Sequence, residues 1–218
     1  MERESEEENN KTGIRIWKYP EEITLEEGIK DAFKNKKLVI FLGVGVSKLI
    51  GCPSWEELSQ KLVEACLIDF KLKEDILNLR DNKKILSICK KILEEKQEGL
   101  FFNELKKSIK ISPEREKKNQ EENKNIYQNL KKISAIILTT NYDDYLSKLY
   151  KESEIAYDPD QFDSENIEKY KLYHLHGHIE NKGSVVVTVD EYLKRYRLTR
   201  FKEFIKKILV NEYTILFI

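Results

Sequence analysis

The sequence predicts an α/β domain with a mostly parallel sheet and an inserted helical subdomain. Short runs near 38–42, 134–140 and 212–218 are apolar almost throughout. Such strands are buried on both faces, which is typical of parallel sheets. Helical patterns alternate with these runs, as in βαβ units, and the stretch at about 54–132 has a mainly helical pattern.

In the first half of the chain, charged and capping residues mark where the predicted strands and helices begin and end. Five apolar residues at 38–42 lie between lysines and a glycine and predict the first strand. Ser54 and Glu57 have the spacing of a capping box, so a helix is expected to begin there. Further helices are expected at 24–35, 82–96, 99–110 and 123–132, with a charged, exposed connection at 112–125.

The second half returns to short apolar runs. Thr188 and Glu191 form another capping pattern at the start of a helix. The expected order is a strand at 134–140, a helix at about 143–150, an irregular acidic stretch at 153–168, strands at about 170–175 and 184–188, a helix at about 190–209 and a strand at 212–218.

Charge and composition restrict the class of protein. Lys and Arg number 39 and so do Asp and Glu, a balance that argues against a general nucleic-acid or membrane binder. The acidic residues 1–12 predict a disordered tail rather than a secretory signal. Three scattered cysteines fit reduced thiols. We therefore expect a cytoplasmic protein with a domain at 13–218 and no nucleic-acid or membrane partner.

A glycine turn follows the first predicted strand. Gly43 and Gly45 let backbone approach a ligand, and the amides of such a turn suit a pyrophosphate. Lys48 stands where the usual dinucleotide fingerprint has a glycine, and no Gly-Lys-Ser/Thr triplet of a P-loop is present. On these residues alone, a tight strand-to-helix turn is an equal alternative.

Polar residues also follow two later strands. Asn141 and Asp143 come after the second predicted strand, where they either bind a ligand or cap the next helix. His174, His176 and His178 alternate along the third. On one strand face they can bind zinc, and a purely structural role is the other alternative. No carboxylate ligand motif accompanies the histidines, so no metal is expected.

Together these motifs resemble the sirtuin superfamily. Its cofactor loop, Gly-x-Gly-x-Ser followed by Gly-x-Pro, is matched across 43–53, its Thr-x-Asn-x-Asp motif across 139–143, and its His-Gly pair at 176–177. Ser54 and Trp55 after the loop, and the segments 185–192 and 201–218, are similar to a bacterial branch found in antiviral defence proteins.

The resemblance implies a Rossmann-like NAD-binding domain with NAD as the substrate. It implies an NAD⁺ glycohydrolase that releases nicotinamide and ADP-ribose and acts in antiviral defence by depleting NAD. Asn141 and His176 would be catalytic. The implied cofactor-binding residues are Gly43, Val44, Gly45, Val46, Ser47, Thr140, Asp143 and Gly177.

Two departures from the family leave alternatives open. No cysteine follows Cys89, so the four-cysteine zinc module of the deacetylases is missing. The sequence ends at Ile218, before the expected Gly-x-Ser turn, which predicts a truncated domain. A non-catalytic NAD or ADP-ribose sensor, a deacetylase or ADP-ribosyltransferase, and a histidine-based metallohydrolase are the alternatives. We also expect the NAD-hydrolysing activity to be controlled by a homo-oligomer or by a missing sensor domain.

Overall fold

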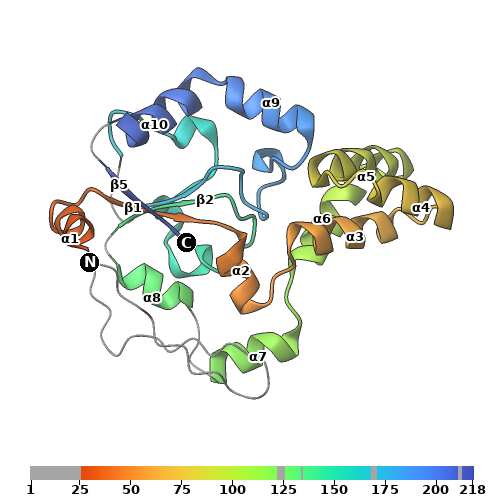
Figure 1. Cartoon of the computed structure of the whole chain (residues 1–218). Coiled ribbons are helices and arrows are strands. Elements are labelled where there is room, and N and C mark those ends of the chain that lie inside the picture. Colours follow the sequence, from red (N-terminus) through yellow and green to blue (C-terminus); the bar gives the residue numbers. More distant parts are fainter. Residues whose placement is uncertain (1–25, 122–125, 134, 168–170, 211–212) are drawn as a thin grey trace, which may run out of the picture.

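The predicted α/β fold is confirmed, and the sheet is parallel throughout. A computed structural model (Figure 1) describes residues 26–121, 126–133, 135–167, 171–210 and 213–218. Within these residues a five-stranded sheet has the order β3-β4-β2-β1-β5. The strands are β1 (Leu38–Leu42), β2 (Ile136–Thr139), β3 (Ile155–Ala156), β4 (Leu172–His174) and β5 (Thr214–Phe217). The predicted tail at 1–12 lies outside the described residues.

β1 lies inside the sheet and has a neighbour on each edge. Ile40 is opposite Ile137 of β2 on one side and Leu216 of β5 on the other. Because side chains alternate between the faces of a strand, Ile40 belongs to one core cluster and Val39 to another. Burial on both faces explains why the strand is apolar at every position.

Helices cover both faces of the sheet (Figure 1). One face packs against α1 (Glu27–Lys34), α2 (Val44–Ile50) and α8 (Ile126–Lys132), and the other against α10 (Thr199–Val210). Tyr127 and Leu130 of α8 are buried in the first core, and Phe201 and Phe204 of α10 in the second. No helix in the described part of the chain is long and apolar enough to cross a bilayer.

Four further helices form a group beside the sheet (Figure 1). They are α3 (Trp55–Ala65), α4 (Phe70–Leu77), α5 (Asn82–Lys96) and α6 (Leu100–Ile109), and they share a core of their own. The predicted capping box of Ser54 and Glu57 is present at the start of α3. Tyr142, Ile179 and Val187 from the sheet side also belong to this core, so apolar burial holds the two parts together.

The stretch predicted as an exposed connection at 112–125 is exposed over 112–118, but it is not irregular, because α7 (Pro113–Glu121) forms there. Proline suits the first position of a helix, where its missing N–H costs nothing. Side chains of α7 also bond the carboxyl end of α2: Arg115 donates to the Leu49 carbonyl and Asn119 to the Ile50 carbonyl. These bonds give the charged helix a fixed position despite its lack of an apolar face.

The helix predicted at about 143–150 is also wrong. The chain makes a bend and turn, and only Ser147–Leu149 are helical, in a 3₁₀ turn. The carboxylate of Asp143 turns inward to Ser47 and also accepts a bond from the Tyr145 amide, and only this short turn follows it. The stretch at 153–168, expected to be irregular, contains the short edge strand β3.

Two predictions near the carboxyl end are corrected. Residues 184–188 are not a strand; the amide of Val186 bonds the His176 carbonyl instead of a ladder partner. Their apolar run reflects burial against the helical group rather than strand pairing. The helix expected at about 190–209 is two helices, α9 (Val189–Arg197) and α10, separated at Leu198 by an extended ψ of 125°. The capping box of Thr188 and Glu191 is confirmed.

Gly177 turns the chain after β4, and its backbone requires glycine. Its φ is +83°, and a Cβ there would lie 2.0 Å from the Ser184 carbonyl oxygen. The loop after β4 can therefore pack on residues 184–186 only without a side chain at this position.

We expect Gly177→Ala to lower the free energy of unfolding by at least about 1–3 kcal/mol, because it adds a clash to a strained φ. Chemical denaturation measures this loss. Gly183→Ala is the matched control in the same loop, since its Cβ would meet only Asn181 Oδ1 at 3.6 Å. Equal stability of the two variants would contradict the assigned packing.

Candidate functional site

The carboxyl ends of β1 and β2 are joined by hydrogen bonds. The amide Nδ2 of Asn141 donates to the Gly43 carbonyl at 2.8 Å, and Thr139 Oγ1 donates to the Leu42 carbonyl at 3.2 Å. This edge is where parallel sheets bind ligands. The structure thus brings the glycine turn and Asn141, 98 residues apart in sequence, into direct contact.

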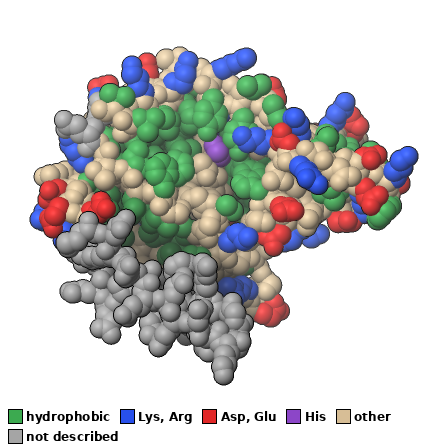
Figure 2. Space-filling view, in the orientation of Figure 1, with side chains coloured by type: hydrophobic (Ala, Val, Ile, Leu, Met, Phe, Trp, Pro, Cys, Tyr) green, Lys and Arg blue, Asp and Glu red, His purple; other side chains and the backbone are tan. Residues whose placement is uncertain are grey.

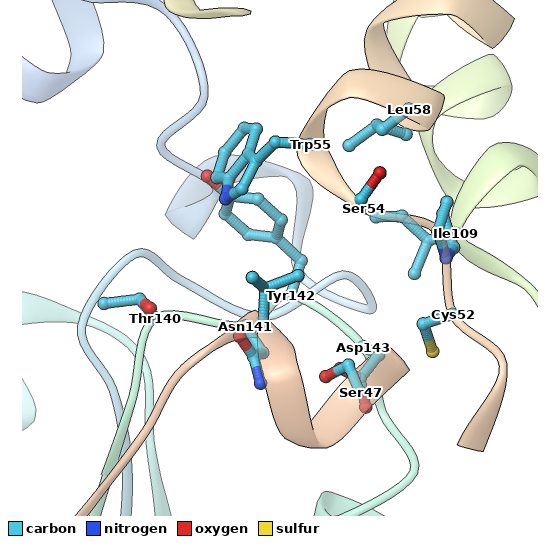
Figure 3. Close-up of a pocket in the computed structure, with 12 residues that line it drawn as sticks. Ser47, Cys52, Ser54, Trp55, Leu58, Ile109, Thr140, Asn141, Tyr142 and Asp143 are labelled. Atoms are coloured by element: carbon cyan, nitrogen blue, oxygen red, sulfur yellow. The ribbon is translucent and has the colours of Figure 1, made fainter. Parts of the chain in front are cut away.

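A small pocket lies at this edge and is called the inner pocket (Figure 3). Its cavity volume of about 40 Å³ holds only a few water molecules. The Trp55 ring meets the Tyr142 ring edge to face at 5.6 Å on one side of it. The lining residues are Val44, Ser47, Cys52, Pro53, Ser54, Trp55, Leu58, Ile109, Thr140, Asn141, Tyr142 and Asp143.

The carboxylate of Asp143 is engaged by protein groups. Ser47 Oγ donates to one oxygen at 2.7 Å, and the Tyr127 hydroxyl lies 3.5 Å from the other. Burial of Asp143 raises the pKa of its carboxyl group above the ordinary range. These bonds join α2, α8 and the loop after β2, so Asp143 holds the floor of the inner pocket in place.

A wider opening, the outer groove, adjoins the inner pocket, since Trp55 and Thr140 line both. Its cavity volume of about 570 Å³ is in the range of small-molecule sites, roughly 300–1,000 Å³. The lining residues are Trp55, Lys83, Thr140, His176, Val189, Tyr192, Leu193, Tyr196 and Arg197. Figure 2 shows a similar mixture on this face, with hydrophobic and basic side chains around a small histidine surface.

His176 lies between two tyrosines of α9. Its Nε2 is 2.9 Å from the Tyr196 hydroxyl and its Nδ1 is 3.4 Å from the Tyr192 hydroxyl. Burial, helped by the positive charges of Arg195 and Lys83, lowers the pKa of His176 to about 4. The imidazole is therefore neutral at pH 7 and keeps one nitrogen lone pair.

The other two histidines support the loops. His174 Nδ1 donates to the Asn141 carbonyl at 3.1 Å, and its Nε2 is 2.8 Å from Ser147 Oγ. The His178 ring stacks on Tyr157. β4 ends at His174, so the three histidines do not alternate along one strand face, which was the premise of the metal alternative. No group of three His, Cys, Asp or Glu side chains among the described residues is placed to hold a metal.

The predicted cofactor-binding residues fall into different environments. A Cβ on Gly45 would meet no atom within 4 Å, so open space adjoins this position at the start of α2. Val46 is buried in the core against the sheet, and Gly177 packs on the Ser184 backbone. Gly45, Val46 and Gly177 line neither the pocket nor the groove. The carbonyl of Gly43 accepts the hydrogen bond from Asn141. The residues that line the inner pocket are Val44, Ser47, Thr140 and Asp143.

Sequence reasoning missed the aromatic walls. Tyr192 and Tyr196 are four residues apart on α9, which places them on one helix face. The spacing of four predicts that the two tyrosines share a helix face, but no local pattern predicts that this face contacts His176. The sequence motif marks Trp55 only as a point of resemblance to the bacterial branch, whereas the structure places it in the lining of both the inner pocket and the outer groove.

Comparison with known proteins bears on the carboxyl-terminal part of the chain. Residues 135–218 match a family model described as a SIR2-like domain. The matched part runs from β2 to β5 and contains Asn141 and His176, whereas the glycine turn lies before it. A SIR2-like domain implies an activity that uses NAD. No curated protein matches the chain.

The depressed pKa of His176 predicts a pH-dependent stability. The imidazole has a pKa of about 6.5 in the unfolded protein, so between pH 6.5 and pH 4 the unfolded state binds a proton and the folded state does not. Stability from this group is therefore present above pH 6.5 and is lost as the pH falls toward 4. Between pH 7 and 5 we expect a loss of about 1–2 kcal/mol.

Unfolding curves at several pH values measure this loss, and His176→Asn should flatten the slope. The raised pKa of Asp143 acts in the opposite sense and the lowered pKa values of His174 and His178 act in the same sense, but all three are common to both proteins and cancel in the comparison. Identical slopes for wild type and His176→Asn would show that this imidazole titrates normally.

Proposed function

We propose that the chain binds NAD at this edge of the sheet and hydrolyses the nicotinamide–ribose bond. The observation that carries the proposal is the meeting of the glycine turn, Asn141 and the His176 loop around an adjoining pocket and groove. The SIR2-like match, which implies NAD chemistry, supports the same reading. The products are nicotinamide and ADP-ribose.

The pyrophosphate lies against the glycine turn. The first amides of a helix lack intrahelical acceptors and attract phosphate oxygens. Gly45 leaves open space where another residue would have a Cβ, so the backbone can approach a ligand closely. The nicotinamide ribose then extends toward Asn141 and the outer groove.

Hydrolysis breaks the bond between the anomeric carbon and the pyridinium nitrogen. Nicotinamide takes the bonding electron pair and leaves as a neutral molecule, so it needs no acid. Water adds its oxygen to the anomeric carbon and gives up one proton to solvent. The protein has to fix the ribose, stabilise positive character at the anomeric carbon and admit the water.

Asn141 and His176 divide this work. One N–H of the Asn141 amide bonds Gly43, which leaves the carbonyl oxygen Oδ1 and the second N–H to orient the water or a ribose hydroxyl. His176 is neutral and accepts a hydrogen bond from a ribose hydroxyl. With a pKa of about 4 it is a weak base, so its main contribution is orientation.

A sensor that binds NAD or ADP-ribose without turnover is the second candidate. The inner pocket is small, with a cavity volume of about 40 Å³, and the Tyr196 hydroxyl is hydrogen-bonded to Nε2 of His176. Both features fit a site that binds ligand but is not yet arranged for chemistry. Calorimetry that shows NAD binding while no nicotinamide appears would favour the sensor.

The resemblance to bacterial defence proteins also suggests a cellular role. An NAD hydrolase of this class acts by depleting NAD in an infected bacterial cell, and an oligomer or a sensor domain restrains it beforehand. Loss of cellular NAD upon phage infection, absent in cells that carry Asn141→Ala, is the expected outcome.

Asn141→Ala and His176→Ala should each reduce nicotinamide release from NAD by about 10²-fold or more, because the ribose and the water are no longer held in position. Chromatography of the products measures this. His178→Asn is the control in the same loop, because residue 178 lines neither the inner pocket nor the outer groove. Equal turnover in all three variants and wild type would remove the proposed catalytic pair.

A further inference from the structure

Both ring nitrogens of His176 contact tyrosine hydroxyls of one helix. Tyr192 and Tyr196 lie one turn apart on α9, with ring centroids 6.2 Å from each other. A neutral imidazole has one N–H donor and one acceptor nitrogen. The two hydroxyls therefore cannot play the same part, and the direction of each hydrogen bond decides which nitrogen carries the proton.

A buried neighbour settles these directions. The Tyr142 hydroxyl donates its single proton to the Val186 carbonyl at 2.7 Å. In the 3.4 Å contact between Tyr142 and Tyr192, Tyr192 must therefore be the donor. Its own proton is then used, so in its 3.4 Å contact with His176 the imidazole Nδ1–H donates and the Tyr192 oxygen accepts.

The remaining nitrogen of His176 is then an acceptor. Nε2 carries the lone pair and receives the Tyr196 hydroxyl proton at 2.9 Å, the shorter of the two contacts. Tyr142, at one end of this series of hydrogen bonds, is 5% exposed, whereas Tyr196, at the other end, is 49% exposed on the groove side. The first tyrosine is held in place and the last can move into solvent.

We propose that Tyr192, oriented by Tyr142, fixes the Nδ1–H tautomer of His176, and that the Tyr196 hydroxyl occupies Nε2 until a substrate hydroxyl replaces it. Tyr192 is thus a positioning residue, and Tyr196 is a displaceable occupant of the site. The second half of this inference rests on the proposed NAD hydrolysis, in which a ribose hydroxyl of NAD is the incoming donor.

The two tyrosines should respond in opposite ways to the same substitution. Tyr192→Phe removes the acceptor for Nδ1–H and releases the tautomer, whereas Tyr196→Phe removes only the competing donor. Both changes keep the ring packing, including the edge contacts of His176 with Tyr192 at 4.9 Å and of Tyr196 with Phe201 at 5.1 Å. Each variant is therefore the matched control for the other.

The tautomer is measured in the free protein by NMR of ¹⁵N-labelled histidine, with His176→Asn used to assign the signal. We expect a protonated Nδ1 and an unprotonated Nε2 in wild type and in Tyr196→Phe. A mixture of tautomers is expected in Tyr192→Phe. A wild-type ring protonated at Nε2 would overturn the proposal. This measurement contains no NAD, so its outcome is independent of the proposed function.

Steady-state kinetics with NAD test the displacement. Tyr192→Phe should lower kcat roughly tenfold or more, since a freed imidazole spends time in the wrong tautomer. Tyr196→Phe should lower KM about two- to tenfold and change kcat less than Tyr192→Phe does, because substrate no longer competes with a protein hydrogen bond. Equal kcat losses in both variants, or a raised KM in Tyr196→Phe, would contradict the assigned roles. Thermal unfolding confirms that both variants are folded.

Discussion

The hydrogen bond from Asn141 to the Gly43 carbonyl is the interaction on which the candidate site depends. It joins the residues that follow β1 and β2, and it fixes the Asn141 amide directly over the glycine turn. The Thr139 hydroxyl makes a second link, to the Leu42 carbonyl, at the last residues of the two strands. Without these bonds two loops that start from neighbouring strands would be free to separate, and no ligand could contact both.

Burial of the strands determines where these bonds form. β1 pairs in register with β2 and β5, and its side chains fill the cores on both faces. Its pairing with β2 fixes Leu42 opposite Thr139, so the two loops begin at the same height. The apolar core thus sets the position of polar residues that contribute little to it.

The helical group supplies one wall of the site. The capping box at Ser54 starts α3 and places Trp55 over both the inner pocket and the outer groove. Tyr142 and Val187 pack into the core of the helical group, which binds it to the sheet. α9 forms the opposite wall with Tyr192 and Tyr196. Three segments distant in the sequence therefore meet around His176 and Asn141.

Much of this could be predicted from local patterns. The strand at 38–42 and the helix at 82–96 match their predicted bounds, because burial and periodicity are local signals. The strand predicted at 184–188 is wrong because a buried extended segment and a strand have the same apolar composition. The contact of Tyr196 with His176 depends on how α9 packs, and no spacing rule contains that information.

The helix predicted after Asp143 fails for a related reason. A polar residue behind a strand usually caps a helix, but this carboxylate is drawn into a buried contact with Ser47, 96 residues earlier in the chain. Local capping rules cannot anticipate such a partner. The glycine turn and Asn141 could be named from motifs, whereas their direct hydrogen bond required the folded structure.

The most direct test of the central claim, that this edge of the sheet holds NAD, is a binding titration with Gly45→Val. No protein atom lies within 4 Å of a Cβ at residue 45, so the substitution should leave the fold intact while filling the space assigned to the pyrophosphate. In a Trp17→Phe background, Trp55 is the remaining tryptophan and reports binding by its fluorescence. We predict a saturable change with NAD that is lost in Gly45→Val. An undiminished response in that variant, or none in the parent, would contradict the account.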